Sequence, residues 1–196
     1  SDGGKTWVKQ YDGLRYGTEG LAYYQALAAA EPENEKYPLL VAEMEFAVSQ
    51  GADKPFFRVA FSDPKHGYAV GAYGMILETN DAGQTWLPVL EKVENDAFKH
   101  VFDFARLPQP GKFFLSGEAG LLIEGDIEQE VGKKVTTVPF EGSFFTIIDA
   151  ADGSLVMGGL RGRMFRSQDS GATWTAVNKP LTSAIVDSTR LPDGRL

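Results

Sequence analysis

The sequence contains no cysteine, which excludes disulfide bonds, zinc sites built from thiolates and catalysis by a thiol. It has no uncharged apolar run of about 18 residues, the minimum for a membrane-spanning helix, and no basic-then-apolar leader. Basic residues are also few. Lys and Arg number 19 against 27 Asp and Glu, and the formal net charge of −8 would repel a phosphate backbone, so we expect no nucleic-acid partner.

Two short motifs recur along the 196 residues. TNDAGQTW at 79–86 returns as SQDSGATW at 167–174, and the chain opens on SDGGKTW, the same pattern without its first letter. A Gly-x-x-Gly pair also occurs three times, with leading glycines 46 and 42 positions apart. These pairs are Gly71 and Gly74, Gly117 and Gly120, and Gly159 and Gly162. Recurrence at such a period predicts a repeat architecture.

Each repeat unit has the composition of a β-meander. Apolar segments alternate with turns in the order strand, turn, strand, Gly-rich turn, strand, box, strand, beginning with FFRVAF, SDPKHG and YAVG at 56–71. The units lack the i, i+3, i+4 periodicity of a helical solenoid. Four-stranded antiparallel units repeated every 40 to 45 residues or so are typical of β-propeller blades, so we predict an all-β propeller.

The repeats divide the chain within a single propeller domain that holds about four blades. We predict the last strand of a blade at 1–13, an insertion at 14–51, blades at 52–95, 96–140 and 141–180, and the start of a further blade at 181–196. In the second of these blades, LLIEGDIEQEVGKK at 121–134 has lost the Gly and Trp of the box, which we interpret as a degenerate copy. Because the sequence begins inside a box and ends inside a turn, we expect part of a ring of about seven blades; a small four-bladed propeller is the alternative.

The box residues have chemistry suited to a structural turn. The Asp carboxylate can accept hydrogen bonds from backbone N–H groups of its own turn, the Gly supplies a positive φ, and the Thr begins the next strand. The Trp ring can be buried between neighbouring sheets. We therefore predict structural roles for Asp2, Gly4, Thr6, Trp7, Asp81, Gly83, Thr85, Trp86, Asp169, Gly171, Thr173 and Trp174.

The pattern Ser/Thr-x-Asp-x-Gly-x-Thr-Trp resembles the Asp-box, or bacterial neuraminidase repeat. More narrowly, HGYAVGAYGMILETNDAGQTW at 66–86 is similar to repeats of the photosystem II assembly and stability factor family. The resemblance covers about residues 52–196 and the first seven, and excludes the insertion. It implies a seven-bladed propeller without catalysis, acting as a protein-binding scaffold or assembly factor for a membrane-associated complex. It also implies a periplasmic or cell-surface location.

The insertion contains TEGLAYYQALAAAEPENEKYP, in which apolar residues share one helical face. We predict a helix over 19–30, capped by Thr18 and ended by Pro32. Residues 39–50 carry both strand-like alternation and helix-favouring composition, so their state stays open. Loops on a rigid scaffold often carry function, and Tyr23, Tyr24 and Tyr37 are candidate partner-binding anchors. The alternative is a segment that covers an edge of the ring.

Four arginines are further candidates for partner binding. They are Arg161, Arg163 and Arg166, which lie close together in sequence, and Arg58, which we place at an equivalent ring position one blade away. Guanidinium groups could bind a partner's carboxylates, or they could neutralise neighbouring acidic residues between blades.

Asp-box propellers also include sialidases and xyloglucanase-like glycosidases, so glycan binding or hydrolysis is the alternative function. Glycosidases need two carboxylates about 5 to 9.5 Å apart. Candidates are Asp103, Glu118, Glu124 and Asp126, but nothing in the sequence pairs them. His66 and His100 have no third histidine near them, and the acidic run 124–130 lacks the oxygen spacing and central Gly of a calcium loop. We therefore expect no catalytic residue, no metal and no cofactor.

Overall fold

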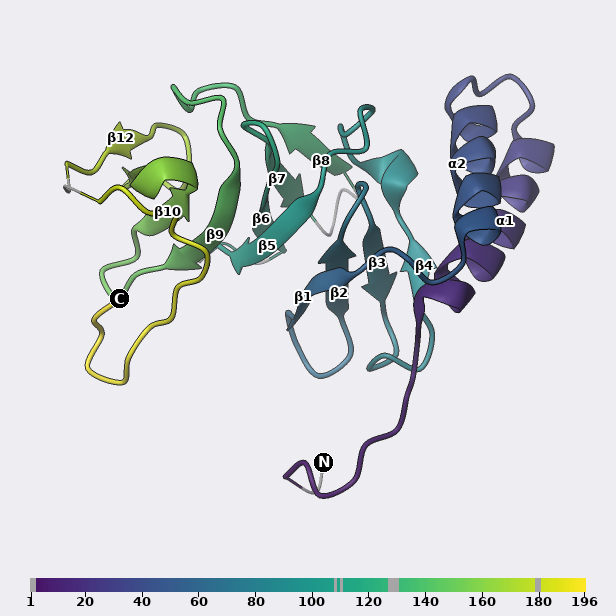
Figure 1. Ribbon diagram of the computed structural model, residues 1–196, viewed down its shortest axis with the longest axis horizontal. Coiled ribbons are helices and arrows are strands. Elements are labelled where there is room, and N and C mark those ends of the chain that lie inside the picture. Colours follow the sequence, from purple (N-terminus) through teal and green to yellow (C-terminus); the bar gives the residue numbers. More distant parts are fainter. Residues whose placement is uncertain (1–2, 108, 110, 127–130, 179–180) are drawn as a thin grey trace.

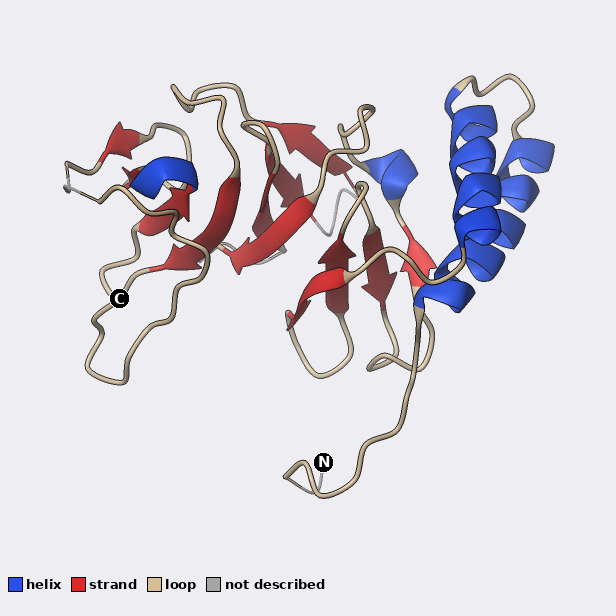
Figure 2. Cartoon of the chain, viewed as in Figure 1, coloured by secondary structure: helices blue, strands red, loops and turns tan. Residues whose placement is uncertain are grey.

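The computed structural model describes residues 3–107, 109, 111–126, 131–178 and 181–196. In these ranges the chain forms three four-stranded antiparallel sheets and a pair of helices (Figures 1 and 2). Each sheet is a meander whose strands follow one another in sequence order. The predicted fold class, a partial β-propeller with a partly helical insertion, is confirmed.

Each sheet is built from short strands separated by tight turns. The first contains β1 (Phe56–Phe61), β2 (Gly67–Gly71), β3 (Ile76–Thr79) and β4 (Leu87–Pro88). The second contains β5 (Val101–Arg106), β6 (Lys112–Gly117), β7 (Leu122–Asp126) and β8 (Val131–Lys134). The third contains β9 (Phe144–Asp149), β10 (Leu155–Gly159), β11 (Met164–Ser167) and β12 (Thr175–Ala176). The three sheets fall inside the ranges predicted for three blades, although the exact boundaries of the blades stay a prediction.

The sheets stand side by side, with β1, β5 and β9 adjacent along one side of the arc (Figure 1). Apolar side chains fill the space between consecutive sheets. Tyr68 of the first sheet packs against Phe104 and Phe113 of the second, with ring centroids 5.6 and 5.1 Å apart. The second and third sheets share another core, in which Phe114 and Trp174 meet edge to face at 6.1 Å. Burial of a large apolar side chain contributes about 1.5–3 kcal/mol, so these contacts hold neighbouring sheets together.

The insertion forms two antiparallel helices, α1 (Gly13–Ala30) and α2 (Lys36–Gln50). The predicted start at residue 19 was wrong. Asp12 caps the helix by accepting a hydrogen bond from Arg15 N at 3.0 Å, whereas Thr18 lies inside it and donates to Leu14 O. Residues 39–50, whose state the sequence left open, are helical. Leu40, Met44 and Ala47 lie on the buried face of this helix. The helices pack beside β4 and the short helix η1 (Leu90–Lys92), and neither meets the length and apolarity needed to cross a bilayer in the described residues (Figure 2).

The two ends of the described chain differ from the strands predicted for them. Residues 3–12 contain no strand, so the last blade strand predicted within 1–13 does not form in this described segment; its end instead packs through the Tyr11 ring, 6.4 Å from that of Phe56 in β1. Residues 181–196 also form no strand, although Ile185 N donates to Gly159 O at 3.0 Å beside β10. The further blade that this segment would begin stays a prediction.

Candidate functional site

The box at 79–86 is held by a dense set of local hydrogen bonds. The Asp81 carboxylate accepts from the Thr85 backbone N–H at 2.8 Å and from the Thr85 hydroxyl at 2.6 Å. Gly83 N donates to Thr79 Oγ1 at 2.8 Å, and the indole N–H of Trp86 donates to Gly83 O at 3.1 Å. The side chains of Thr79, Asp81, Thr85 and Trp86 therefore all form hydrogen bonds within the turn itself.

The box at 167–174 repeats this geometry bond for bond. Thr173 donates to Asp169 from its N–H at 2.9 Å and from its hydroxyl at 2.6 Å, and Trp174 Nε1 donates to Gly171 O at 3.0 Å. The hydrogen bonds from Thr173 lower the pKa of Asp169 to about 2. Both boxes bury their tryptophans, which are 6% and 7% exposed at Trp86 and Trp174.

The box at the start of the chain has the same turn in a different setting. Gly3 and Gly4 have φ values of 72° and 81°, and Trp7 Nε1 donates to Gly4 O at 3.0 Å. The Trp7 side chain is nevertheless 89% exposed, which contradicts the prediction that this ring is buried between sheets. Asp2 lies outside the described residues, and Thr6 has an interaction partner.

The Gly-x-x-Gly pairs form the hairpin turns between the second and third strand of each sheet. Met75 N donates to Ala72 O at 3.1 Å, and the two residues between have positive φ, 54° at Tyr73 and 71° at Gly74. Positive φ at both central positions is the pattern of a type I′ turn, which suits the twist of a hairpin. The same pattern occurs at Ala119 and Gly120 (48° and 74°) and at Arg161 and Gly162 (57° and 68°).

The leading glycine of each pair is required by a close backbone contact. A Cβ added to Gly71, Gly117 or Gly159 would lie 2.4, 2.3 or 2.2 Å from a carbonyl oxygen that precedes the first strand of the same sheet. The middle residues at the turn tips are less easily explained. Tyr73 and Arg161 hold a left-handed conformation that costs a side-chain-bearing residue about 1–2 kcal/mol. Arg161 is exposed, whereas the half-exposed Tyr73 ring packs edge to face against His100 at 4.8 Å.

A row of phenylalanines crosses the inner strands near these turns. Phe57, Phe102 and Phe145 occupy the second position of β1, β5 and β9, and their ring centroids are 5.3 and 5.0 Å apart. The strand register shifts at this position in all three sheets, which is the effect of a β-bulge and explains how the rings leave the packed face. They line a pocket of about 280 Å³ together with Arg58 and Asp103.

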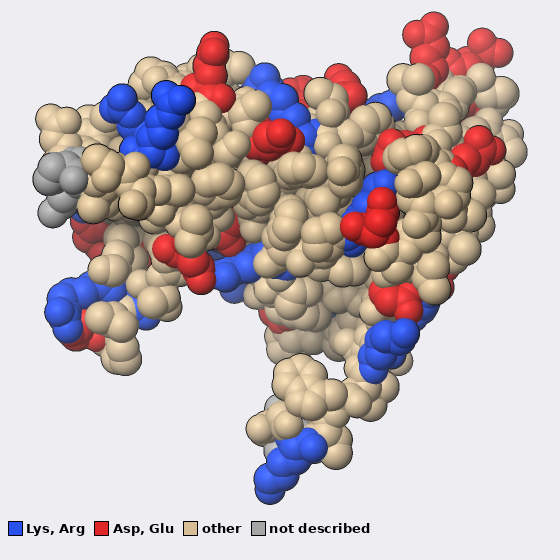
Figure 3. All heavy atoms as spheres, viewed as in Figure 1, with Lys and Arg blue, Asp and Glu red and all other residues tan. Residues whose placement is uncertain are grey.

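The four candidate arginines fall into two groups. Arg58 pairs with Asp103 at 3.0 Å, and Arg166 pairs with Asp152, so these two neutralise acidic neighbours. Arg161 and Arg163 are exposed, and their guanidinium groups have no hydrogen-bond or ion-pair partner within the described part of the chain. Figure 3 shows Lys and Arg side chains gathered over the short helix η2 (Leu160–Gly162) at one end of the arc. The structure therefore does not unite the four residues into one cluster.

The tyrosines proposed as anchors are turned toward the protein. Tyr24 is fully buried and Tyr37 is 7% exposed, so neither can be an anchor for a partner in this conformation. The Tyr24 hydroxyl donates to Glu91 at 2.9 Å and accepts from Leu90 N at 2.9 Å, and burial raises its pKa. Tyr23 also donates to Glu91, at 3.1 Å. The sequence did not reveal that this face of α1 and α2 packs on η1.

Three of the four candidate glycosidase carboxylates are held in structural contacts, and the fourth, Glu124, is exposed on β7. Asp103 is 3% exposed and accepts hydrogen bonds from Thr146 Oγ1 at 3.0 Å and Ile147 N at 2.9 Å, in addition to its Arg58 pair. Asp126 pairs with Lys112 at 2.9 Å. Glu118 accepts from His100 N at 3.2 Å. No group of three or more His, Asp or Glu among the described residues could hold a metal ion.

Sequence reasoning missed the phenylalanine row, although a signal was present. FFRVAF, VFDFAR and FFTIID, aligned by the repeat, all place Phe at the second position. Alternation alone could not show that a bulge turns these rings out of the packed face. The unusual tip residues Tyr73 and Arg161 could also have been found, since a type I′ turn normally uses Gly, Asn or Asp there.

Known proteins resemble this chain in both sequence and structure. A relative named Photosystem II assembly lipoprotein Ycf48, from Synechococcus sp. (strain CC9902), is 28% identical over 139 residues, which are 69% of this chain and 40% of that protein. The chain therefore spans less than half the length of this relative. The solved structure "YCF48 bound to D1 peptide" matches with a TM-score of 0.59 and 26% identity, over 71% of this chain and 44% of that chain.

A glycosidase shares the architecture at lower sequence similarity. The GH74 xyloglucanase from Xanthomonas campestris matches with a TM-score of 0.52 and 18% identity, over 63% of this chain and 21% of that chain. This likeness shows the fold alone.

The family model described as "Photosynthesis system II assembly factor YCF48" matches residues 42–196, which is most of the chain and all three sheets. This chain belongs to that family.

Proposed function

We propose that this chain is a non-catalytic protein-binding scaffold, of the photosystem II assembly factor type, that supports a membrane-associated complex. The relatives are named assembly factors, and one solved relative holds a D1 peptide, so an extended protein segment is the class of partner that we propose here. The name of that relative as a lipoprotein supports a periplasmic or cell-surface location for this chain as well.

The observation that carries the proposal is the pair of exposed arginines at η2, Arg161 within it and Arg163 directly after it. Arg161 occupies a strained left-handed tip, with φ of 57°, on a chain of net charge −8. Strain of this kind is found at functional sites when the fold does not require the side chain. Two nearby guanidinium groups without described partners can form bidentate hydrogen bonds to carboxylates of a bound segment.

The test uses the 196-residue chain and a fluorescently labelled D1 peptide of the kind named in the solved relative. Fluorescence anisotropy should show saturable binding, and the double substitution Arg161→Glu with Arg163→Glu should weaken it about tenfold or more. The matched control is the double substitution Lys65→Glu with Arg106→Glu, which makes the same charge change at two exposed positions of the first and second sheets. Equal losses in the variant and the control would mean that overall charge, not this pair, governs binding.

The absence of catalysis is tested separately. A panel of fluorogenic glycosides and xyloglucan oligosaccharides should give no turnover above that of a heat-denatured sample. Turnover that is lost in an Asp103→Asn or a Glu118→Gln variant would reject the proposal in favour of the glycan-hydrolysing alternative. Those two carboxylates are chosen because each lies on the side of the sheets where the inner strands begin.

A further inference from the structure

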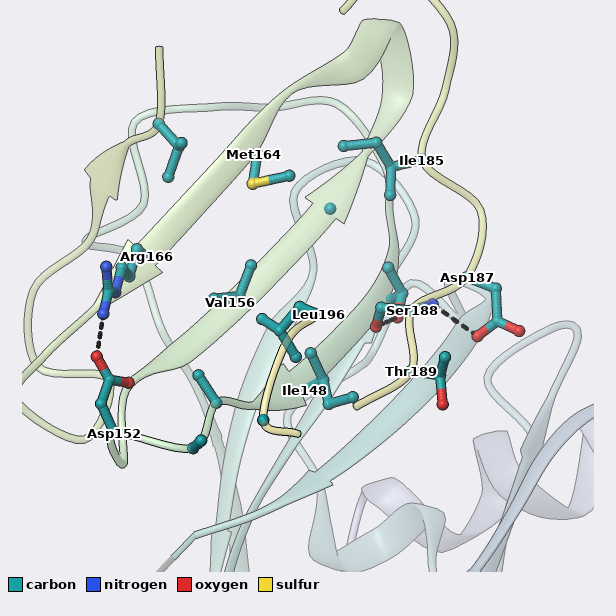
Figure 4. A pocket seen from close by; sticks show the side chains of 16 residues that line it. Ile148, Asp152, Val156, Met164, Arg166, Ile185, Asp187, Ser188, Thr189 and Leu196 are labelled. Carbon is teal, nitrogen blue, oxygen red and sulfur yellow. Dashed lines mark hydrogen bonds and ion pairs between the residues drawn. The ribbon is translucent and has the colours of Figure 1, made fainter. Parts of the chain in front are cut away.

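A groove of about 720 Å³ lies on the third sheet (Figure 4). Val156 and Met164 line it at the positions that Phe114 and Leu122 occupy in the second sheet, where Trp174 packs. The groove is therefore the face on which one repeat packs against the next, and it indicates no ligand. The junction between the first and second sheets, by contrast, has a chemistry that packing does not explain.

The tip of the β2–β3 turn is held by a histidine that directly precedes β5 of the neighbouring sheet. The backbone N–H of Tyr73 donates to Nδ1 of His100 at 2.7 Å. The two rings also meet edge to face, with centroids 4.8 Å apart. Tyr73 has φ of 54°, a left-handed conformation that its own side chain disfavours. The bond to His100 therefore holds a strained residue in place from the second sheet.

The second and third sheets are joined by the same contact with different chemistry. The tip residue Ala119 occupies the place of Tyr73, and its N–H donates to the hydroxyl of Ser143 at 3.3 Å. Ser143 directly precedes β9, as His100 precedes β5. A serine hydroxyl can accept at any pH near neutrality, whereas a histidine ring ordinarily changes its charge between about pH 5 and pH 8. The repeat therefore contains one junction that can titrate and one that cannot.

The tip bond requires the neutral form of His100. Nδ1 accepts from an N–H only when it carries no proton, so in this geometry the ring proton lies on Nε2. A proton added at Nδ1 would oppose the N–H of Tyr73 and replace the bond by repulsion. The backbone of His100 is fixed independently, because its carbonyl accepts from Glu118 N at 2.9 Å and its N–H donates to the Glu118 carboxylate at 3.2 Å. The change therefore falls on the Tyr73 tip and not on β5.

Charged groups of both signs lie on the elements packed around the His100 ring. The rings that contact it from β1 and β5 are uncharged, at centroid distances of 6.3 and 6.0 Å for Phe57 and Phe102. The charged side chains on these elements are Glu118 of the β6–β7 turn, Lys99 directly before His100, Lys54 across the Tyr73 ring, and the paired Arg58 and Asp103. An acidic neighbour favours a protonated ring, and basic neighbours disfavour it. Among these contacts, the bond from Tyr73 is made by the ring nitrogen itself and exists in one protonation state.

Tyr73 connects this junction to the helix pair. The ammonium group of Lys54, a buried residue, lies 5.1 Å from the centroid of the Tyr73 ring and 5.1 Å from that of Phe46 in α2. Lys54 also pairs with Glu43 of α2 at 3.7 Å. Cation–π contacts are strongest when the cation is desolvated, as it is here. A Tyr73 ring that leaves the tip therefore removes one of the contacts between α2 and the first sheet.

We propose that His100 is a pH-sensitive latch on the Tyr73 tip. Neutral His100 holds the tip in its left-handed conformation and keeps the Tyr73 ring on Lys54, and protonated His100 releases both. The bond is present above the pH at which His100 takes up its proton and is lost as the pH falls through it. The β2–β3, β6–β7 and β10–β11 turns are equivalent, so the latch lies on the same rim of the arc as Arg161. It acts on the shape of that rim whatever the rim binds.

NMR of the isotopically labelled 196-residue chain tests the latch directly. At about pH 8 a scalar coupling across the N–H···N bond should join Tyr73 N to His100 Nδ1, and it should vanish by about pH 5 as the His100 ring titrates. The amide of Ala119, whose acceptor is a serine, should change little over this range. The sequence has two histidines, so His66→Gln leaves His100 as the one titrating ring and should leave the transition unchanged.

Two substitutions of the latch separate its chemistry from its shape. His100→Asn places an amide oxygen near the position of Nδ1 that can accept at every pH, so the Tyr73 amide should keep its chemical shift from about pH 8 to pH 5. His100→Ala removes the acceptor, and protection of the Tyr73 amide from exchange should fall about two- to tenfold at pH 8, the range expected for one hydrogen bond.

Three results would overturn the proposal. The first is a coupling in the wild-type chain that persists while the His100 ring titrates. The second is a change at Tyr73 whose midpoint differs from that of His100, and the third is a His100→Asn variant that still shows the transition. The wild-type measurement decides the outcome even if a substitution at His100 prevents folding.

Discussion

The box at 167–174 and the box at the start of the chain share a turn and differ in environment. In both, the indole N–H donates to the carbonyl of the box glycine, at 3.0 Å, and the same two positions have positive φ. Trp174 is 7% exposed, and Trp7 is 89% exposed. The comparison teaches that the turn is encoded by a few neighbouring residues, whereas burial of the tryptophan depends on what surrounds the turn. Trp174 packs on the preceding sheet, and Trp86 is buried by Phe61 of its own sheet and the segment at Gln10 and Tyr11.

The largest expected effect is a difference in the free energy of unfolding between substitutions of the two tryptophans. Trp174→Ala should lower the free energy of unfolding by about 3–5 kcal/mol, because it opens a cavity beside Phe114. Trp7→Ala should change it by less than about 0.5 kcal/mol, since the ring is 89% exposed and has almost no contacts to lose. Urea unfolding followed by circular dichroism measures both. Similar losses in the two variants would show that Trp7 is packed in solution.

The repeat allowed much of the fold to be predicted. The sequences of the boxes and the spacing of the Gly-x-x-Gly pairs predicted three four-stranded sheets, because each motif requires backbone conformations that only a few residue types adopt at low energy. Trp86 and Trp174 are buried as expected. These features depend on residues near one another in sequence, and the period supplies their arrangement in space.

The features that failed depend on contacts between distant residues. Nothing in the spelling of SDGGKTW shows whether a sheet lies beside it, so Trp7 was placed in a core that the described chain does not provide. Tyr24 and Tyr37 lie on an amphipathic helix pair whose partner, η1, is more than 50 residues away in sequence. Asp12, and not Thr18, caps α1, because tertiary packing extends the helix by about a further turn and a half at its N-terminus.

Acid tests the turn because it protonates the carboxylate of Asp169 that accepts hydrogen bonds from Thr173. The folded-state pKa of Asp169 is about 2, below its usual 3.8. A carboxyl group whose pKa is lowered by folding stabilises the protein above its unfolded pKa, and this contribution is lost as pH falls toward the folded pKa. Asp169→Asn should therefore lower the Tm at pH 7, and the difference from wild type should shrink between about pH 4 and pH 2.

Differential scanning calorimetry across this pH range measures the effect, with Asp96→Asn as an exposed control outside the boxes. The control should follow wild type at every pH. A gap between wild type and Asp169→Asn that persists at pH 2 would mean that Asp169 acts through its shape or its packing, not through the charge that accepts hydrogen bonds from Thr173.

The smallest effect concerns the tip of the turn, where the boxes differ by one methyl group. Ala82 has φ of 64°, and the box at the start of the chain has Gly3 in the equivalent place at 72°. Ala82→Gly relieves about 1–2 kcal/mol of left-handed strain and adds about 0.4–1 kcal/mol of unfolded-chain entropy, so a net gain of about 0.5–1 kcal/mol is expected. Gly3→Ala should leave global stability unchanged, because its turn is not packed on the sheets. Urea unfolding of both variants measures the change in the free energy of unfolding. A lower value for Ala82→Gly than for wild type would show that the methyl group contributes packing that outweighs the strain.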